Sequence, residues 1–117
     1  MGENMPMIQS KIAGSVPQEK REALKAELGK AISILGKPES YLMLSIEDGQ
    51  DLYFAGKKLD KGAYVEVKLL GGVDSSASQK MTQKICEIFD RLLGVPGSSI
   101  YVSYWGTQNW GHDGYNF

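Results

Sequence analysis

The chain is short of cysteine and histidine, and each shortage excludes a kind of chemistry. Its 117 residues contain one cysteine, Cys86, so neither a disulfide framework nor a thiol redox pair can form within the chain. We expect Cys86 to be a small buried apolar residue. The one histidine, His112, has no second ligand at a metal-binding spacing, and we expect neither a metal ion nor a cofactor.

An excess of one charge and a long apolar run are also missing. The 13 basic residues stand against 14 acidic ones, which leaves no basic field to neutralise a nucleic-acid backbone. No apolar run approaches the ~20 residues of a membrane span, and residues 1–12 lack the features of a signal peptide. We therefore expect a soluble, cytoplasmic protein with no nucleic-acid partner and no membrane insertion.

The chain does contain one sequence pattern that occurs twice. With 42% apolar and 23% charged residues, it has the composition of a single domain, which we place at 1–117. The segments "ILGKPESYLMLSI" (34–46) and "LLGVPGSSIYVSY" (92–104) both combine a helix end, a Gly-x-Pro and a strand. Gly36 and Gly94 stand where a helix C-terminus needs positive φ, and a proline two residues later prevents each helix from continuing.

Each copy is predicted to be a strand, an amphipathic helix and a second strand. The opening strands are expected at 6–12 and 64–70, and the closing strands at 41–46 and 100–105. Two apolar stripes at helical spacing should face the sheet: Leu24, Leu28, Ala31, Ile32 and Leu35 in the first copy, and Met81, Ile85, Ile88, Phe89 and Leu92 in the second.

Polar residues mark the helix starts. Ser15 and Gln18 predict a capping box for a first helix that begins near residue 16. Asp74 or Ser75 should cap the second helix.

Two such units predict a two-layer α+β (α/β) fold, with a four-stranded sheet and both helices on one face. The second face, with Ile, Val, Leu and Met positions, would lack cover in a monomer, so we expect further copies of the chain to cover it. Between the copies, "LYFAG" (52–56) predicts a small edge strand. The tail, 106–117, predicts a short hairpin that pairs with a neighbouring subunit.

Five short sequence motifs follow one another along the chain. They are Met5-Pro6-Met7, "LGKPESY" (35–41), "LLGGV" (69–73), "IYVSY" (100–104), and "NWG" followed by Phe117. In this order and spacing the chain resembles the macrophage migration inhibitory factor (MIF) branch of the tautomerase superfamily. The resemblance implies a homotrimer whose sheets wrap into a barrel, with an active site between each pair of subunits.

Keto–enol tautomerisation needs a base that is neutral near pH 7 and groups that steady the enol oxygen. The resemblance implies that Pro6 is the N-terminal residue of the mature protein and that its secondary amine is this base. An apolar pocket and a fixed cation, Lys37, would both push that amine toward its neutral form. Lys37 would also hold the carboxylate of a small aromatic 2-oxo acid such as phenylpyruvate, with D-dopachrome as a further substrate.

The resemblance assigns further residues to substrate binding. The backbone amide of Leu70 would bind the carboxylate, and Tyr101 and Ser103 would hydrogen-bond from the adjacent subunit. The aromatic wall would consist of Tyr41, Trp110 and Phe117.

The chain departs from the family pattern at three places. Ser103 stands where asparagine is common, and its shorter hydroxyl would reach the substrate oxygen less well or through a water molecule. His112 stands where tryptophan is frequent, so the resemblance places this histidine near the rim of the pocket. Gly62 and Val65 replace the Cys-x-x-Cys of some relatives, which removes their thiol–disulfide chemistry.

Each residue also has a simpler interpretation. Taken singly, Lys37 is a solvated cation at a helix C-terminus, and Tyr101 is a packed strand residue. Trp110 is equally an interface anchor, and His112 an exposed turn residue.

The N-terminus is the main obstacle to the enzymatic hypothesis. A proline inside a chain has a tertiary amide nitrogen without basicity, so Pro6 needs residues 1–4 to be a non-native or processed extension and Met5 to be removed. The alternative is a cytokine-like signalling protein that binds a cell-surface receptor, has a vestigial or blocked pocket and is secreted without a signal peptide. A third hypothesis is an unrelated ferredoxin-like binding module.

Overall fold

The fold is a four-stranded sheet covered on one face by two helices, in a computed structural model that describes residues 5–117. The extension expected at 1–4 lies outside the described residues. The sheet strands are β1 (Pro6–Ala13), β2 (Met43–Gln50), β5 (Ala63–Leu70) and β6 (Ile100–Thr107). The helices are α1 (Gln18–Ala31) and α2 (Ser75–Leu93), with short 3₁₀ turns η2 (Ile32–Leu35), η3 (Glu39–Tyr41) and η4 (Gly97–Ser99).

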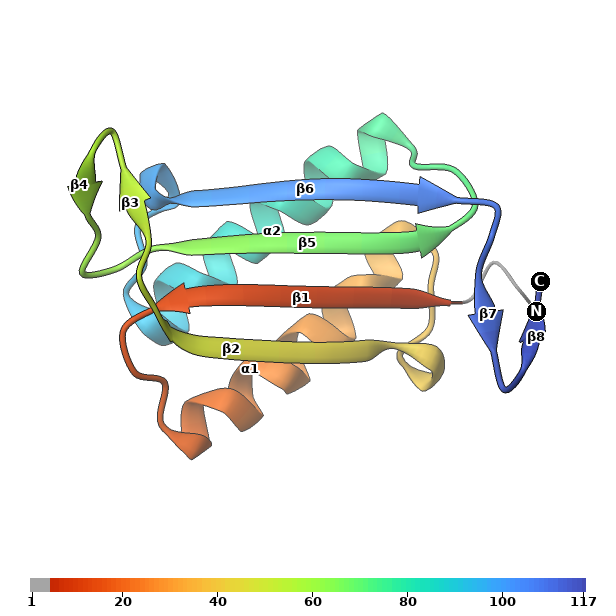
Figure 1. Cartoon of the computed structure of the whole chain (residues 1–117), viewed down its shortest axis with the longest axis horizontal. Coiled ribbons are helices and arrows are strands. Elements are labelled where there is room, and N and C mark those ends of the chain that lie inside the picture. The colour runs from red at the N-terminus through yellow and green to blue at the C-terminus, as the bar shows by residue number, and fades with distance from the viewer. Residues whose placement is uncertain (1–4) are drawn as a thin grey trace.

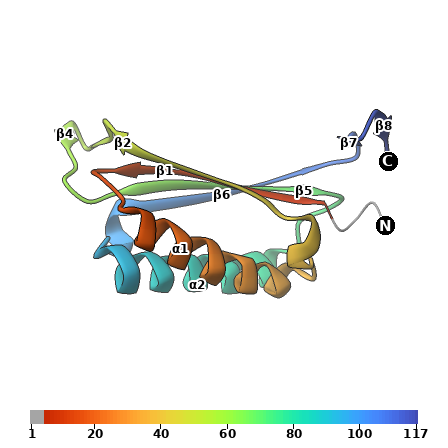
Figure 2. The ribbon, with the colours of Figure 1, turned by 90° about the horizontal axis from the view of Figure 1, so that it is seen from below.

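The strand order β2-β1-β5-β6 confirms the duplicated unit. Strands β1 and β2 are parallel, β5 and β6 are parallel, and the two pairs meet through antiparallel β1 and β5. Each parallel pair is joined by a crossover through one helix, and both helices lie on the same face (Figures 1 and 2). The predicted two-layer fold is therefore confirmed.

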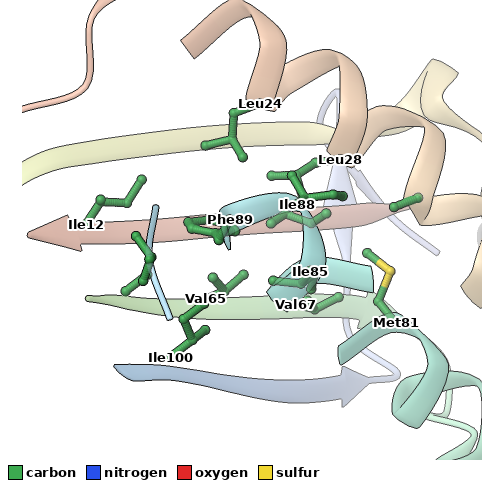
Figure 3. Packing of buried hydrophobic residues seen from close by; sticks show 14 of the residues in the cluster. Ile12, Leu24, Leu28, Val65, Val67, Met81, Ile85, Ile88, Phe89 and Ile100 are labelled. Atoms are coloured by element: carbon green, nitrogen blue, oxygen red, sulfur yellow. The ribbon is translucent and has the colours of Figure 1, made fainter. Parts of the chain in front are cut away.

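The core lies between the helices and the sheet (Figure 3). Alternate residues of β1 and β5 point toward the helices, so Ile8 and Val67 are fully buried while their neighbours are partly exposed. The predicted stripes supply the other layer: Leu24, Leu28, Ile32, Met81, Ile85, Ile88 and Phe89 are all fully buried. Burial of each such side chain stabilises the fold by about 1.5–3 kcal/mol. Cys86 is half-buried on α2 and packs against this core, and its burial raises the pKa of the thiol.

The helix ends agree with the sequence in three cases and differ in one. Gly36 and Gly94 adopt φ of 74° and 68° at the ends of η2 and α2, and Asp74 caps α2 by accepting from the N–H of Ala77 at 2.7 Å. The predicted Ser15–Gln18 capping box is wrong. The residue before α1 is Pro17, whose side chain cannot accept a hydrogen bond.

A contact from another element replaces that capping box. The N–H of Val16 donates to the carboxylate of Asp48 at 2.8 Å, and Arg21 of α1 forms an ion pair with the same carboxylate. The start of α1 is therefore anchored by the end of β2, a contact between residues distant in the sequence.

Two hairpins lie at opposite ends of the sheet (Figure 1). The small strand predicted within "LYFAG" is present as β3 (Tyr53–Phe54), but in the described chain it pairs with β4 (Lys57–Lys58) and not with the four-stranded sheet. Between them Ala55 and Gly56 have φ of 53° and 79°, the geometry of a type I′ turn. In the tail, β7 (Gly111–His112) and β8 (Tyr115–Asn116) confirm the predicted hairpin. Its pairing with a neighbouring subunit stays a prediction.

The uncovered face of the sheet is more polar than predicted. Side chains on this face alternate with the buried ones along each strand, and they include Gln9, Lys11, Glu47, Tyr64, Glu66, Lys68, Ser103 and Trp105. The aliphatic residues of the strands instead face the helices. None of the helices in residues 5–117 is long and apolar enough to span a bilayer.

Candidate active site

Segments from both copies and the tail meet at one end of the sheet (Figure 1). A cavity of about 810 Å³ opens there, within the roughly 300–1,000 Å³ range typical of small-molecule sites. Its walls include Pro6, Met7, Tyr41, Lys68, Trp110 and His112. Three of the residues predicted for the site, Pro6, Tyr41 and Trp110, therefore line one cavity.

Pro6 is held at this cavity by the register of the sheet. It is the first residue of β1, where a residue without an N–H disturbs the strand ladder least. It pairs with Leu69 of β5 on one side, and the next residue, Met7, pairs with Met43 of β2 on the other. The ring of Pro6 is therefore buried at the start of an interior strand.

Lys37 and Leu70 are brought together beside the residue that precedes Pro6. Gly36 turns the chain out of η2, and the Nζ atom of Lys37 donates to the carbonyl oxygen of Leu70 at 3.4 Å. The backbone N–H of Leu70 donates to the carbonyl oxygen of Met5 at 3.2 Å. The two groups predicted to bind a substrate carboxylate, the Lys37 ammonium and the Leu70 amide, thus lie together at Leu70. The Leu70 amide already donates to the carbonyl oxygen of Met5.

The tail forms an aromatic rim around the cavity. The His112 ring stands edge-on to Tyr41, with centroids 6.5 Å apart, and stacks on Phe117 at 6.4 Å. The N–H of Phe117 donates to the carbonyl oxygen of Trp110 at 2.9 Å, which closes the β7–β8 hairpin. All three predicted wall residues, Tyr41, Trp110 and Phe117, therefore lie at this rim.

The charged residues of the wall are mostly basic. Lys25 and Lys68 line the cavity together with one acid, Glu39, whose carboxylate lies directly against Gly29 of α1. Lys25 pairs with Glu22 of its own helix, whereas the closest acidic partner of Lys68 lies 3.9 Å away. The wall therefore favours an anionic ligand over a cationic one.

Tyr101 lies at the other end of the sheet from Pro6. In the strand register Pro6 is level with Leu69 and Gly106, whereas Tyr101 is level with Tyr64, five residues further along. At ~3.4 Å per residue this separation is about 17 Å. The Tyr101 ring is 65% exposed and packs on Phe54 of β3 with centroids 5.6 Å apart. One chain therefore does not bring Tyr101 to its own Pro6.

Ser103 already has partners within its own chain. Its Oγ atom lies 2.8 Å from the hydroxyl of Tyr64 and accepts from the indole N–H of Trp105 at 2.9 Å. These contacts hold the hydroxyl on the uncovered face of the sheet, away from the cavity beside Pro6 of the same chain.

Two features of this cavity were not assigned a role from the sequence. His112 is exposed and is part of the wall, which agrees with the position near the pocket rim that the resemblance implied, although no role was assigned to it there. The contact of Met5 with Leu70 pairs backbone atoms 65 positions apart, so no local pattern indicates it. The departure from tryptophan at position 112 was the one signal available for the first.

Comparisons with known proteins agree with this arrangement. A family model described as macrophage migration inhibitory factor matches residues 5–116. The macrophage migration inhibitory factor homolog of Trichuris trichiura is 31% identical over 81 residues, which cover 69% of this chain and 70% of the relative. The crystal structure of Leishmania major MIF2 is 33% identical with a TM-score of 0.91, and covers 99% of this chain and 100% of that chain.

A second crystal structure also matches this chain over most of its length. The macrophage migration inhibitory factor homologue from Prochlorococcus marinus is 31% identical, with a TM-score of 0.85, over 95% of this chain and 98% of that chain. The family model and these structures span the duplicated unit, the cavity and the tail. The chain therefore belongs to the macrophage migration inhibitory factor family.

Proposed function

We propose that the protein is an isomerase that interconverts the keto and enol forms of phenylpyruvate-like 2-oxo acids, with D-dopachrome as a further substrate. The proposal rests on one observation: the ammonium group of Lys37 contacts Leu70 one residue from Pro6, beside a cavity with an aromatic rim. Lys37 and Leu70 offer a place for a carboxylate beside the cavity. The cavity itself offers a place for a ring and contains Pro6, which becomes a base when it is the N-terminal residue.

Pro6 supplies the base when residues 1–5 are absent. Its nitrogen is then a secondary amine, and burial together with the nearby Lys37 ammonium disfavours protonation of that amine. The neutral amine takes a proton from the carbon next to the substrate carbonyl, and the carbonyl oxygen is protonated to give the enol. Ketonisation is the reverse: the oxygen loses its proton and the carbon gains one.

Removal of residues 1–5 would also free the backbone N–H of Leu70 to bind the substrate carboxylate. The carbonyl oxygen of Met5 is an acceptor that occupies the N–H of Leu70. In a chain that begins at Pro6 this N–H is available to a carboxylate oxygen of the substrate, within reach of the Lys37 ammonium. Charge-assisted hydrogen bonds of this kind are among the stronger ones in proteins.

The site is completed by a second subunit in a homotrimer of barrel form. Tyr101 and Ser103 lie along β6, at the sheet edge opposite β2, and Tyr101 is largely exposed in the single chain. Because one chain cannot bring Tyr101 to its own Pro6, the residue acts in the cavity of a neighbouring copy, where its hydroxyl steadies the enol oxygen. Exposed Tyr53, Phe54 and Trp105 are further residues for contacts between copies.

A cytokine-like role is the second candidate function. It is favoured by the Met5–Leu70 contact, because the chain with Met5 in place has neither a basic nitrogen nor a free Leu70 amide. In that form the protein would act through its surface on a cell-surface receptor. Its cytoplasmic location, and secretion without a signal peptide, stay predictions.

The test is the rate of ketonisation of phenylpyruvate enol by two preparations, one that begins at Pro6 and one that begins at Met1. We expect turnover only from the first. Pro6→Gly in the shorter chain should lower the rate by about 100-fold or more, the size of a general-base contribution, without loss of the trimer. Receptor binding by the longer chain would instead support the cytokine-like role. No turnover by the shorter chain, although it folds as a trimer, would overturn the enzymatic proposal.

A further inference from the structure

We infer that His112 determines substrate specificity by hydrogen bonding to a polar group on the far edge of the substrate ring. The site then prefers a 4-hydroxyphenyl group to a phenyl group. This inference rests on the proposed function, because it needs the substrate ring to lie at the aromatic rim. It concerns a residue to which neither the sequence nor the proposed mechanism assigns a role.

The position of the His112 ring is well defined. It contacts two aromatic rings: Tyr41, edge to face at 6.5 Å, and Phe117, stacked at 6.4 Å. The backbone that carries it is a tight hairpin, in which Asp113 and Gly114 adopt φ of 51° and 84°. An imidazole held in this way presents its nitrogens in a restricted set of directions, which a hydrogen bond requires.

The imidazole adds a chemical property to the rim. Phe117 offers only an apolar ring surface, whereas a neutral imidazole carries one donor nitrogen and one acceptor nitrogen. A phenol hydroxyl can pair with either nitrogen, and an unsubstituted ring with neither. His112 also lines the cavity, so it lies where a bound substrate can contact it.

The orientation of the substrate directs its ring to this residue. The carboxylate is held where Lys37 meets Leu70, and the reacting carbon lies at Pro6. The side chain of the 2-oxo acid then extends from Pro6 toward the tail hairpin, where Tyr41, Trp110 and His112 line the same cavity. The 4-position is the part of the ring most distant from the carboxylate, and it lies against the rim.

Ser103 is the competing candidate for the same role. Its hydroxyl is already within hydrogen-bond distance of Tyr64 and Trp105 of its own chain. Turning it toward a substrate in a neighbouring cavity would break these contacts, whereas His112 needs no rearrangement. The geometry therefore favours His112.

The first experiment compares kcat/KM for 4-hydroxyphenylpyruvate and phenylpyruvate, using the chain that begins at Pro6. His112→Phe keeps an aromatic ring in contact with Tyr41 and Phe117 but removes both nitrogens. We expect it to lower the ratio of the two kcat/KM values by about 2- to 10-fold, the effect of one hydrogen bond. His112→Gln, which keeps a donor and an acceptor, should restore part of the ratio, and Ser103→Ala should leave the ratio unchanged.

A binding measurement separates this inference from the proposed function. Titration calorimetry with 3-(4-hydroxyphenyl)propionate and 3-phenylpropionate measures the same preference without turnover. Loss of the preference in His112→Phe supports the inference even if neither keto acid reacts. An unchanged ratio in a folded, trimeric His112→Phe protein, or a ratio that falls in Ser103→Ala instead, overturns it. Failure of the shorter chain to bind either acid also overturns it.

Discussion

The carbonyl oxygen of Met5 accepts a hydrogen bond from the backbone N–H of Leu70 at 3.2 Å, directly ahead of Pro6. Met5 is 5% exposed, so this contact is sheltered from water. The residue before Pro6 therefore affects two groups at once: it makes the Pro6 nitrogen an amide, and it occupies a donor that the proposed mechanism assigns to the substrate.

An acetyl group on Pro6 should reproduce both effects. Its carbonyl group is in the same chemical position as that of Met5, so it should block turnover and also weaken binding of 3-phenylpropionate. Calorimetry on acetylated and free chains that begin at Pro6 measures the second effect. We expect binding weaker by about 10- to 100-fold, the effect of one hydrogen bond to a charged group. Equal affinities would show that the Leu70 amide does not hold the carboxylate.

Lys37→Gln should lower kcat/KM for phenylpyruvate by about 10- to 100-fold, because a hydrogen bond to a charged group contributes about 1.5–3 kcal/mol. Loss of the nearby cation should also raise the pKa of the Pro6 amine, which moves the acid limb of the pH–rate profile to higher pH. Lys30→Gln, an exposed lysine of α1, is the control of equal charge. A lower kcat/KM with an unmoved acid limb would limit Lys37 to binding.

Subunits with different defects should restore activity to each other. A Pro6→Gly chain and a Tyr101→Phe chain each carry one intact half of a shared site. If the chains mix randomly during refolding, about one quarter of the sites combine an intact Pro6 with an intact Tyr101. The measurement is activity before and after joint refolding, and each variant refolded alone is the control. If mixing gave no gain in activity, Pro6 of one subunit and Tyr101 of another would not form a shared site.

Gly106→Ala should destabilise the fold by about 1–3 kcal/mol through overpacking. A Cβ at this position would collide with the backbone carbonyl oxygen of Gly71, which cannot rotate away as a side chain can. The carbonyl of the next residue, Thr107, accepts from the N–H of Gly71 at 2.8 Å, so the two segments are held together. Thermal unfolding measures the effect. Gly97→Ala is the control, because a Cβ there meets no described atom within 4 Å.

Asp48 should make the protein sensitive to acid. The N–H of Val16 and then the guanidinium of Arg21 hold the pKa of its carboxyl group below the usual 3.8. Because the folded-state pKa is the lower one, this contribution is present above about pH 4 and is lost as the pH falls through the lowered value. Asp48→Asn should therefore lower Tm at neutral pH and reduce the further loss of Tm on acidification.

A suitable control for this comparison is Asp60→Asn, a change of equal charge in an exposed loop. It should leave the dependence of Tm on pH close to that of the unchanged protein. If Asp48→Asn and the unchanged protein lost Tm equally in acid, the anchoring of α1 by Asp48 would not contribute to stability.

Local patterns were reliable where a structural requirement is local. The two stripes, one with Leu24 and one with Phe89, face the sheet, and Gly36 and Gly94 end their helices at positive φ. Periodicity and backbone freedom depend on neighbouring residues, so both features could be predicted. The predicted capping box at Ser15 failed because α1 begins after Pro17, and an aspartate of β2 instead accepts from the N–H of Val16. The small strand predicted within "LYFAG" formed, and a tight turn pairs it with β4 in a separate hairpin.

The sequence by itself determined the two strand–helix–strand units, the sheet with helices on one face and the family. Hydrophobic periodicity and turn chemistry encode these features along short segments. Only the tertiary structure decided which residues share the cavity, that Tyr101 lies about 17 Å from the level of Pro6, and that the His112 ring contacts both Tyr41 and Phe117. Strand register and the path of the tail set these distances, and both depend on contacts between residues far apart in the chain.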